Sequence, residues 1–509
     1  MVCPKETDLL SKKSINMTRQ YSFILVIMMA VVNLATAQGV PDAVRWSVFA
    51  PGGTARTLGV GGAFGAMGGD FSVININPAG IAEYKRGEFT ISPSVTSTNS
   101  DAYFFNNPTS ASSYKASKFG LDNAAFVIAK PKNGTWKSSN FTIGFSKIAD
   151  LNNNFRLNAK STGSITQRFI QEANGKILDD LDDFEAWPAF DAGAIYDTDK
   201  DLEYEADIFP DEAVEKSQIV NQKGAINEFS IGWAGNYENK LNVGVSMGIP
   251  LVSFEEFKQY EEDDPLDEIP FFNNLQFNEF LNTTGYGVNF KVGFIYNLQK
   301  YLRIGGALHS PTWYTLNDDY FTDLSYSYYD NGIQDLNHRS PDGSFKYKLN
   351  TPWKAVGSIG SIYSLGKVKG FVNADVEWVD YSSNKFDFAK YSTDPGELDY
   401  TLDVNNEISQ VLGSALNLRL GTELALGKFR LRVGTERAKS PYVDQESRIT
   451  TNSFGFGLRE NNFFLDFGFQ KRSFKDSYLP YYLNDASQNP VANVESSKNR
   501  VVVTAGFKF

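Results

Sequence analysis

Residues 52–81 read GGTARTLGVGGAFGAMGGDFSVININPAGI, with nine glycines in thirty positions and a closing Asn77-Pro78-Ala79-Gly80. So much glycine disfavours a regular helix or strand, because glycine loses the most backbone entropy on ordering. The same stretch holds more apolar bulk than a solvated linker needs, in Leu58, Val60, Phe64, Phe71, Val73, Ile74, Ile76 and Ile81. We therefore expect a compact plug packed against the wall of a larger container, with a flexible glycine-rich linker as the alternative.

A nucleotide-binding loop fits this stretch less well. After Gly59 and Gly61, the G-x-G-x-x-G pattern requires glycine at position 64, which is Phe64, and no β-α-β unit surrounds the stretch. The Asn77-Pro78 pair favours a turn whatever its function. We therefore expect residues 77–80 to position the plug on the wall first, with any gating role added to that.

Residues 1–37 have the features of a secretory signal peptide. Met17 is followed by an arginine, a ten-residue apolar run and a small-x-small cleavage site at 35–37. We expect Met17 to be the true start and Gln38 the mature N-terminus, because so short an apolar run does not span a bilayer. Cys3, the single cysteine, lies upstream of the cut and not at it. Neither a lipoprotein anchor nor a disulfide is expected.

The composition of the chain favours one class of membrane protein. Aromatic residues make up 14% of the chain, phenylalanine alone occurs 40 times, and no later segment approaches eighteen consecutive apolar residues. A secreted chain that is rich in glycine and phenylalanine and lacks apolar helices fits a closed β-barrel. The net charge of −12 disfavours nucleic acid as a partner.

Fourteen runs of sequence alternate with the period of two that is typical of β-strands. The last is the clearest, with one apolar face made of Val501, Val503, Ala505, Phe507 and Phe509. The runs lie near 87–97, 118–130, 139–150, 223–236, 240–256, 282–297, 301–315, 344–364, 367–383, 411–425, 428–442, 446–459, 462–474 and 497–509. One face of each run is bulky and apolar, whereas the other holds glycine with scattered polar and charged residues.

Short turns and long connections alternate between these runs. The long connections are 98–117, 151–222, 257–281, 316–343, 384–410 and 475–496. Short turns on one rim and long loops on the other are the signature of an outer-membrane barrel, and an even strand number returns the C-terminus to the short-turn, periplasmic side. We predict an all-β fold, a 14-stranded antiparallel transmembrane β-barrel over 87–509, in the outer membrane of a Gram-negative type of cell. The terminal Phe509 resembles the sorting signal that the barrel assembly machinery reads.

The long loops are acidic and aromatic, with the densest acidic runs at 179–185 and 261–264. Carboxylates there could bridge divalent cations at a lipopolysaccharide surface. A solvated external face is the alternative that we favour. Because no D-x-D-x-D-G loop occurs, a dedicated calcium site is not expected.

The chain resembles the FadL/TodX family of outer-membrane transporters for long-chain fatty acids and other hydrophobic compounds. The resemblance rests on the leader, the fourteen strands, the terminal Phe509, and Gly-Gly-Asp70-Phe71-Ser72 running into residues 77–80. It implies that residues 38–86 form an N-terminal hatch (plug) inside the barrel and close it to water. It also implies passive transport: the ligand is captured at the extracellular loops, enters a pocket near the hatch, and leaves sideways through the wall into the membrane.

The implied route needs two kinds of residue. A lateral exit needs a local break in strand pairing, such as a glycine or a bulge, and Gly144 is the candidate because the third strand is kinked in family members. A carboxylate ligand needs a cation in the lumen. The candidates that face inward by alternation are Arg419, Arg430, Arg432, Lys291 and Arg303. Asp375 and Glu377 should also face inward, so the favoured alternative is that these charges pair with one another across the lumen.

Other functions remain open from the sequence. The chain could be a receptor or transporter for another ligand such as haemin, for which His309 and His338 are the two histidines available, or a secretion-accessory barrel. An open porin is disfavoured by the expected hatch. Two histidines and no Gly-x-Ser-x-Gly elbow leave no catalytic constellation, so we expect no enzyme, no cofactor and no metal site.

Overall fold

The computed structural model describes residues 39–49, 52–104, 112–445 and 448–509. The predicted leader, with Met17, Cys3 and the cleavage site before Gln38, lies outside these residues. The described part of the predicted hatch, 39–49 and 52–86, is called the N-terminal segment below. It contains α2(Val40–Ser47), α3(Ala55–Gly59) and two 3-10 turns, η1(Phe71–Asn75) and η2(Pro78–Glu83).

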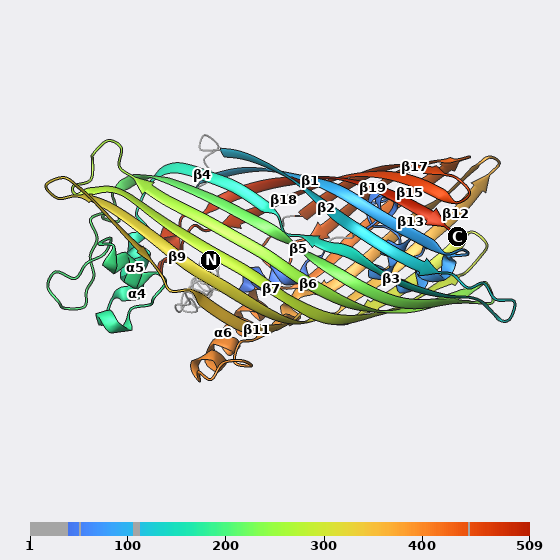
Figure 1. Cartoon of the computed structure of the whole chain (residues 1–509), viewed down its shortest axis with the longest axis horizontal. Helices are drawn as coiled ribbons and strands as arrows, with labels where there is room; N and C mark the ends of the chain where they lie inside the picture. The colour runs from blue at the N-terminus through green and yellow to red at the C-terminus, as the bar shows by residue number, and fades with distance from the viewer. Residues whose placement is uncertain (1–38, 50–51, 105–111, 446–447) are drawn as a thin grey trace, which may run out of the picture.

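The rest of the chain forms a closed antiparallel barrel (Figure 1). Nineteen strand segments, five of which continue a neighbouring segment after a short interruption, make fourteen wall strands, as predicted. In wall order they are β1(Glu88–Phe104), β2(Ser112–Ile128), β3(Trp136–Asp150) with β4(Asn153–Thr162), β5(Ala213–Tyr237), β6(Leu241–Asp263), β7(Phe272–Asn297), β8(Leu302–His309) with β9(Trp313–Tyr329), β10(Ile333–Arg339) with β11(Gly343–Asn350) and β12(Lys354–Leu365), β13(Val368–Asp380) with β14(Lys385–Asp387), β15(Ser414–Leu426), β16(Phe429–Lys439), β17(Arg448–Arg459), β18(Phe463–Tyr478) and β19(Ala492–Lys508). β19 pairs with β1 along its length and closes the ring.

The wall is apolar outside and polar inside. On β5, Phe229, Ile231 and Trp233 point outward and are exposed. Glu228 and Ser230, which alternate with them, point inward and are buried. A soluble sheet would bury the first set, so this arrangement makes lipid the solvent of the outer face. The predicted alternation is therefore confirmed. No helix in the described ranges is both long and apolar enough to cross a membrane.

Several connections predicted as long loops are strand instead. β9 continues to Tyr329 and pairs with β10, so most of 316–343 extends the wall, and His338 lies on a strand rather than in a loop. β6 and β7 extend in the same way into 257–281. The apolar outer residues of β6 end near Leu251. Beyond that belt the alternation reverses, because Val252, Phe254 and Tyr260 on the inner face are buried while Ser253 and Glu255 on the outer face are exposed.

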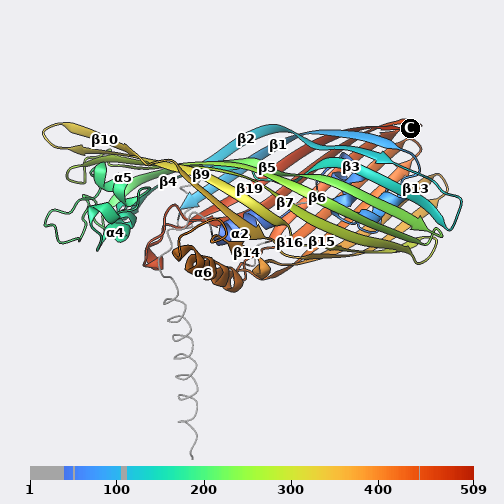
Figure 2. The same cartoon turned by 60° about the horizontal axis from the view of Figure 1, so that its bottom comes forward.

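Two true loops carry helices at the end of the barrel away from the C-terminus (Figures 1 and 2). Residues 163–212, called the cap below, contain α4(Thr166–Ala173), η4(Leu178–Asp180) and α5(Ala186–Asp191). The cap packs on the inner face of the extended strands, as in the contact of Phe169 with Phe277 at 5.4 Å between ring centroids. The second loop follows β14 and carries α6(Gly396–Val411), whose buried side chains join a cluster with α2. The remaining short turns are η5(Tyr381–Ser383) and η6(Ala486–Gln488).

Part of each dense acidic run has a structural use. Asp182 accepts hydrogen bonds from the backbone N–H groups of Glu185 and Ala186 at the start of α5. Glu262 is buried and accepts hydrogen bonds from the Ser164 hydroxyl and the Ile165 N–H in the cap. Asp182 therefore caps a helix within the cap, and Glu262 holds the cap to β6; neither is one of the two roles that we considered for the acidic runs.

Candidate functional site

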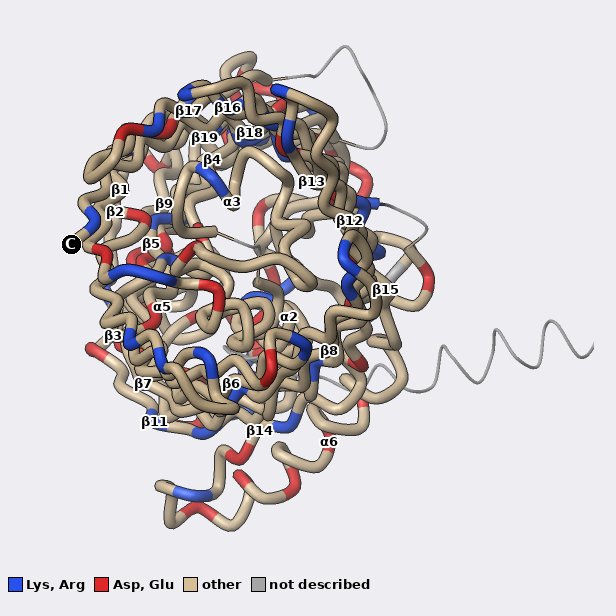
Figure 3. Tube along the Cα trace, turned by 90° about the vertical axis from the view of Figure 1, so that its right-hand side faces the viewer, with Lys and Arg blue, Asp and Glu red and all other residues tan. Residues whose placement is uncertain are grey.

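The N-terminal segment lies against the inner face of the barrel wall. Figure 3, a view along the barrel, shows α3 within the ring of strands. The backbone N–H of Ala55, at the start of α3, donates to the Thr504 hydroxyl of β19 (2.8 Å). The N–H groups of Phe64 and Gly65 donate to the Asp375 carboxylate of β13 (2.9 and 3.1 Å). Asp375, predicted to face inward, thus anchors this segment.

Asn77 ties the segment to a second part of the wall. Its Oδ1 accepts from the N–H of Ala79 and caps η2, while its Nδ2 donates to the carbonyl oxygens of Gly65 (2.7 Å) and Phe294 (2.9 Å). Pro78 follows at the first position of this turn, where a missing N–H costs nothing. The predicted positioning role of residues 77–80 agrees with these contacts.

Glycines on the inner face of the wall make room for this packing. A Cβ added at Gly434 would lie 2.0 Å from the carbonyl carbon of Val60, and one at Gly293 would lie 2.1 Å from Asn77 Oδ1. Both distances are far shorter than any real contact of a Cβ atom. The glycine-rich inner face read in the sequence is therefore the surface on which the N-terminal segment packs.

Four of the five predicted lumen cations are paired with carboxylates. Arg419 forms ion pairs with Glu377 (2.9 Å) and Glu436 (2.8 Å). The other pairs are Arg432 with Glu423 and Asp466, Lys291 with Glu228, and Arg303 with Glu83. Arg430, near the C-terminal rim, donates to backbone carbonyls. The pairing alternative therefore describes the resting state, and a head-group role for any of the five stays a prediction.

Lys354 is a lumen cation that the sequence reading missed. Its side chain is buried on β12, donates to the Ser47 carbonyl oxygen at 3.2 Å, and lies 3.9 Å from the Phe49 ring centroid. Among the described residues no carboxylate oxygen lies within 4.0 Å of its Nζ. Lys354 shares the inner face of β12 with Val356 and Gly360, so alternation within the run 344–364 contained the signal.

A small cavity lies beside Lys354 in the barrel interior. It holds about 60 Å³ of free space, which is enough for a few water molecules or a head group but not for an alkyl chain. Its charged and histidine lining consists of Lys354, Lys291, Arg419, Glu228, Glu377 and His309, and its apolar lining includes Phe49, Ile76 and Ile148. Of the five predicted cations, Lys291 and Arg419 meet at this cavity, whereas Arg303, Arg430 and Arg432 do not line it.

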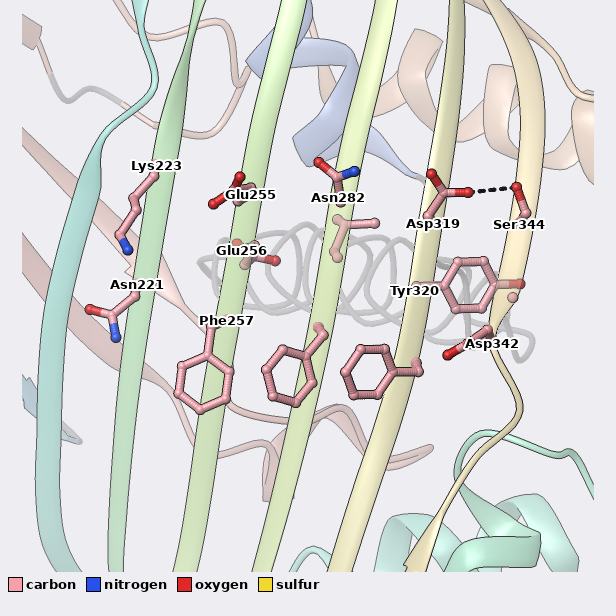
Figure 4. Close-up of a pocket in the computed structure, with 14 residues that line it drawn as sticks. Asn221, Lys223, Glu255, Glu256, Phe257, Asn282, Asp319, Tyr320, Asp342 and Ser344 are labelled. Carbon is pink, nitrogen blue, oxygen red and sulfur yellow. Dashed lines mark hydrogen bonds between the residues drawn. The ribbon is translucent and has the colours of Figure 1, made fainter.

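A larger hollow of about 740 Å³ lies on the outer face of the extended strands (Figure 4). Three phenylalanines stand side by side in this hollow, Phe257 on β6, Phe280 on β7 and Phe321 on β9. The ring centroids of Phe257 and Phe280 are 4.8 Å apart, and those of Phe280 and Phe321 are 4.3 Å apart. Glu256, next to Phe257, points the other way, toward Arg45 of α2. These alternating directions place the hollow outside the barrel, on the other side of the sheet from the cavity.

Strand pairing is interrupted between β2 and β3, but not at Gly144. Gly144 pairs with Ala125 on one side and Ser230 on the other, and a Cβ there would lie 2.5 Å from the Phe71 ring. The register at Gly144 is therefore intact, and the close approach of Phe71 makes Gly144 a packing position for the N-terminal segment. The prediction of a break at Gly144 therefore needs correction.

The pairing of β2 with β3 stops at Asn123 and Ser146. From Leu121 to Ser112, β2 pairs with β1 alone and has no buried residue, and Asp122 is skipped where the register with β1 shifts. The register of β3 with β5 shifts between Lys147 and Ala149, which marks a β-bulge in β3. The interruption, called the seam below, starts two residues beyond Gly144 and adjoins Ile148 of the cavity lining.

The two histidines do not form a common site. His309 is buried at the cavity, with its Nε2 3.1 Å from the Ile76 carbonyl oxygen, and His338 contacts Asp191 of α5. His338 pairs with Leu324 of the neighbouring wall strand. His309 lies on that same wall strand, fifteen residues before Leu324, so the two histidines are roughly 50 Å apart along it. Within the described part of the chain no cluster of three or more His, Cys, Asp and Glu side chains is placed to hold a metal.

Comparison with known proteins identifies the fold. No family model and no curated protein matches this chain. Among solved structures, a FadL homologue of Pseudomonas aeruginosa matches with a TM-score of 0.53 and 10% identity, over 91% of this chain and 100% of the other. The Pseudomonas putida toluene transporter TodX matches with a TM-score of 0.51 and 12% identity, over 91% and 100%. At this identity the likeness shows a shared fold, and it confirms the fold that the resemblance implied.

Proposed function

We propose that this chain is an outer-membrane transporter of the FadL/TodX type. It carries hydrophobic molecules, foremost long-chain fatty acids, by passive diffusion through a plugged barrel with lateral exit into the membrane. The proposal is supported by the apolar outer wall, by the N-terminal segment packed across the lumen, and by the cavity that adjoins the seam. The outer-membrane lipid, including lipopolysaccharide, surrounds it, and Phe509 is read by the barrel assembly machinery.

The observation that carries the fatty-acid part is Lys354. A buried ammonium beside a cavity, held by one carbonyl oxygen and one ring face, is matched best by a carboxylate. Phe49, Ile76 and Ile148 line the same cavity, so an alkyl chain would follow the head group into apolar surroundings. Each buried methylene contributes about 0.8 kcal/mol, which is enough to draw a long chain out of water.

The size of the cavity adds a step to this route. Because about 60 Å³ does not hold an alkyl chain, we propose that this arrangement is a closed state and that a ligand enters when part of the N-terminal segment moves. Phe49 and Ile76 belong to that segment and line the cavity together with wall residues. Displacing them joins the head-group site to the seam without opening the whole lumen.

Equilibrium binding of two matched probes tests the proposal. Purified protein is titrated with dodecanoate and with dodecanol, for wild type, Lys354→Met and the outward-facing control Lys346→Met. We expect Lys354→Met to weaken dodecanoate binding at least tenfold, about 1.4 kcal/mol, and to leave dodecanol binding and the control unchanged. Equal weakening of both probes, or none, contradicts the head-group role of Lys354. Absence of binding by either probe to wild type contradicts the transport proposal.

Uncharged hydrocarbons are the second candidate ligand class, and one observation favours them. Arg419 and Arg432 are each saturated by two carboxylates, so most of the interior charge is unavailable to a charged ligand. One of the structures that share the fold is described as a toluene transporter. A wild-type protein that binds toluene and dodecanol but not dodecanoate would favour this class. The haemin alternative gains no support from two histidines that lie far apart.

A further inference from the structure

A buried ion pair joins β2 to β3 across the seam. Asp122 of β2 is fully buried, and Lys147 of β3 places its Nζ 3.1 Å from the Asp122 carboxylate. Among the ion pairs formed by described residues, this is the one that joins β2 to β3 or β4. It stands directly beyond the last paired residues, Asn123 and Ser146.

Asp122 is held independently from its own side of the seam. Its carboxylate accepts from the Ser94 hydroxyl of β1 (2.7 Å) and from Arg500 Nε of β19 (2.6 Å). Lys147, in contrast, projects from the bulge of β3, and Gly120 leaves the space that its amine fills: a Cβ at Gly120 would lie 2.6 Å from Lys147 Nζ. The pair therefore links a fixed acceptor to a donor on the irregular edge.

The N-terminal segment meets the same residues from inside the lumen. A Cβ at Gly52 would lie 2.6 Å from the Lys147 carbonyl oxygen and 3.4 Å from the Arg500 guanidinium. Ile148, the next residue, lines the cavity with Gly52. The direct hydrogen bonds from the outer part of β2, such as Asn158 to Ser112 at 3.1 Å, are exposed and hold little in water. Deeper in the barrel, Lys498 of β19 pairs with Asp150 at the end of β3, and Phe104 of β1 packs with Phe155 of β4.

We propose that the Asp122–Lys147 pair is a latch that keeps the lateral exit shut until the N-terminal segment moves. The inference rests on the proposed function. A buried pair is a weak source of net stability but a good device for selecting one of two arrangements, because parting the charges leaves an uncompensated charge in a dry site. Here Asp122 keeps Arg500 when the latch opens, so opening strands only Lys147, which turns outward with the bulge. Gly52 of the N-terminal segment lies against the Lys147 backbone and near the Arg500 guanidinium, so displacement of the segment frees the latch.

Distance measurement between spin labels tests the latch. Labels are placed at Phe119→Cys on β2, where the native side chain is 73% exposed, and at Arg156→Cys on β4, in a Cys3→Ser background in lipid nanodiscs. Wild type should give one short distance, and Lys147→Met should add a longer population. Gly120→Ala, which displaces the lysine amine, should do the same, and Lys147→Arg should restore the single distance. Lys475→Met, which breaks an exposed pair within the intact wall, serves as the control.

Two outcomes overturn the latch: a Lys147→Met distribution identical to that of wild type, or an equal change with Lys475→Met. Heat-modifiable migration on gels confirms that each barrel is folded before it is measured. In the same nanodiscs, dodecanoate release to lipid should be several-fold faster for Lys147→Met at unchanged equilibrium affinity. If dodecanoate fails to bind wild type while the distances still respond to Lys147→Met, the proposed function fails and the latch stands.

Discussion

At the scale of single residues, alternation predicted which way a side chain faces but not what it meets. Arg419, Lys291 and Asp375 all face the lumen as expected, because a strand gives every second residue the same side. Their partners come from other strands or from the N-terminal segment, and no local pattern encodes that registry. Lys354 was missed for the same reason: its facing was readable, whereas its lack of a carboxylate partner appears only in three dimensions.

Arg419 provides a test of the pairing. Arg419→Met leaves the buried Glu436 and the half-buried Glu377 without their shared guanidinium. Breaking a buried pair in this way costs about 3–5 kcal/mol. We expect that loss in the free energy of unfolding, measured with urea in lipid vesicles. A variant as stable as wild type would show that these carboxylates find other partners, and Arg419 would then be available to bind a head group.

At the scale of elements, the strands were predictable within the lipid belt and not beyond it. All fourteen were found, but β9 and β10 continue through most of a predicted loop. In this part of β9 the apolar face is the inner one, with Leu324 and Tyr326 buried against the cap, so the pattern used for the lipid belt does not apply. The glycines facing the lumen were read as one half of the alternation, and the structure gives them a physical reason, since Val60 and Asn77 approach them too closely for any side chain.

Docking of the N-terminal segment can be disturbed at one of these glycines. Gly434→Ala places a methyl group where the Val60 backbone lies, whereas Gly357→Ala on β12 meets nothing within 4 Å. In planar bilayers we expect little conductance from wild type and from Gly357→Ala, and steady ion conductance from Gly434→Ala. Large steady conductance from wild type would instead favour an open porin.

The cap should loosen as the pH rises. Burial raises the pKa of Glu262, which lies beyond the lipid belt, and burial also raises that of Glu185 despite its bond to Arg168. The folded cap therefore holds protons that the unfolded cap releases, so this stabilisation is complete below about pH 4.5, the ordinary glutamate value, and is lost as the pH rises through the raised pKa. Hydrogen exchange of residues 163–173, corrected for intrinsic rates, should show less protection at pH 7 than at pH 5. Glu262→Gln should flatten this difference, and a cap equally protected at both values would refute the sign.

At the scale of the whole molecule, the fold was predictable because lipid outside and packing inside impose opposite demands on alternate residues. The lumen was predictable only in outline. A glycine-rich stretch with apolar bulk indicated a packed segment, yet the cavity is formed by residues that are distant in sequence, including Phe49, Gly52, Ile148 of β3 and Lys354 of β12. The resemblance to the FadL/TodX family supplied the proposed route. We propose its exit at the interruption beyond Ser146, because Gly144 keeps its pairing with both neighbouring strands.

The central claim is that this barrel binds and moves hydrophobic molecules. Mass spectrometry of what remains bound after purification from membranes, in a detergent unlike lipid, tests it most directly. The account predicts a stoichiometric fatty acid in the wild-type barrel and its loss from Lys354→Met, with Lys346→Met retaining it. An empty barrel, or a bound tetrapyrrole in its place, would contradict the account and leave only the fold.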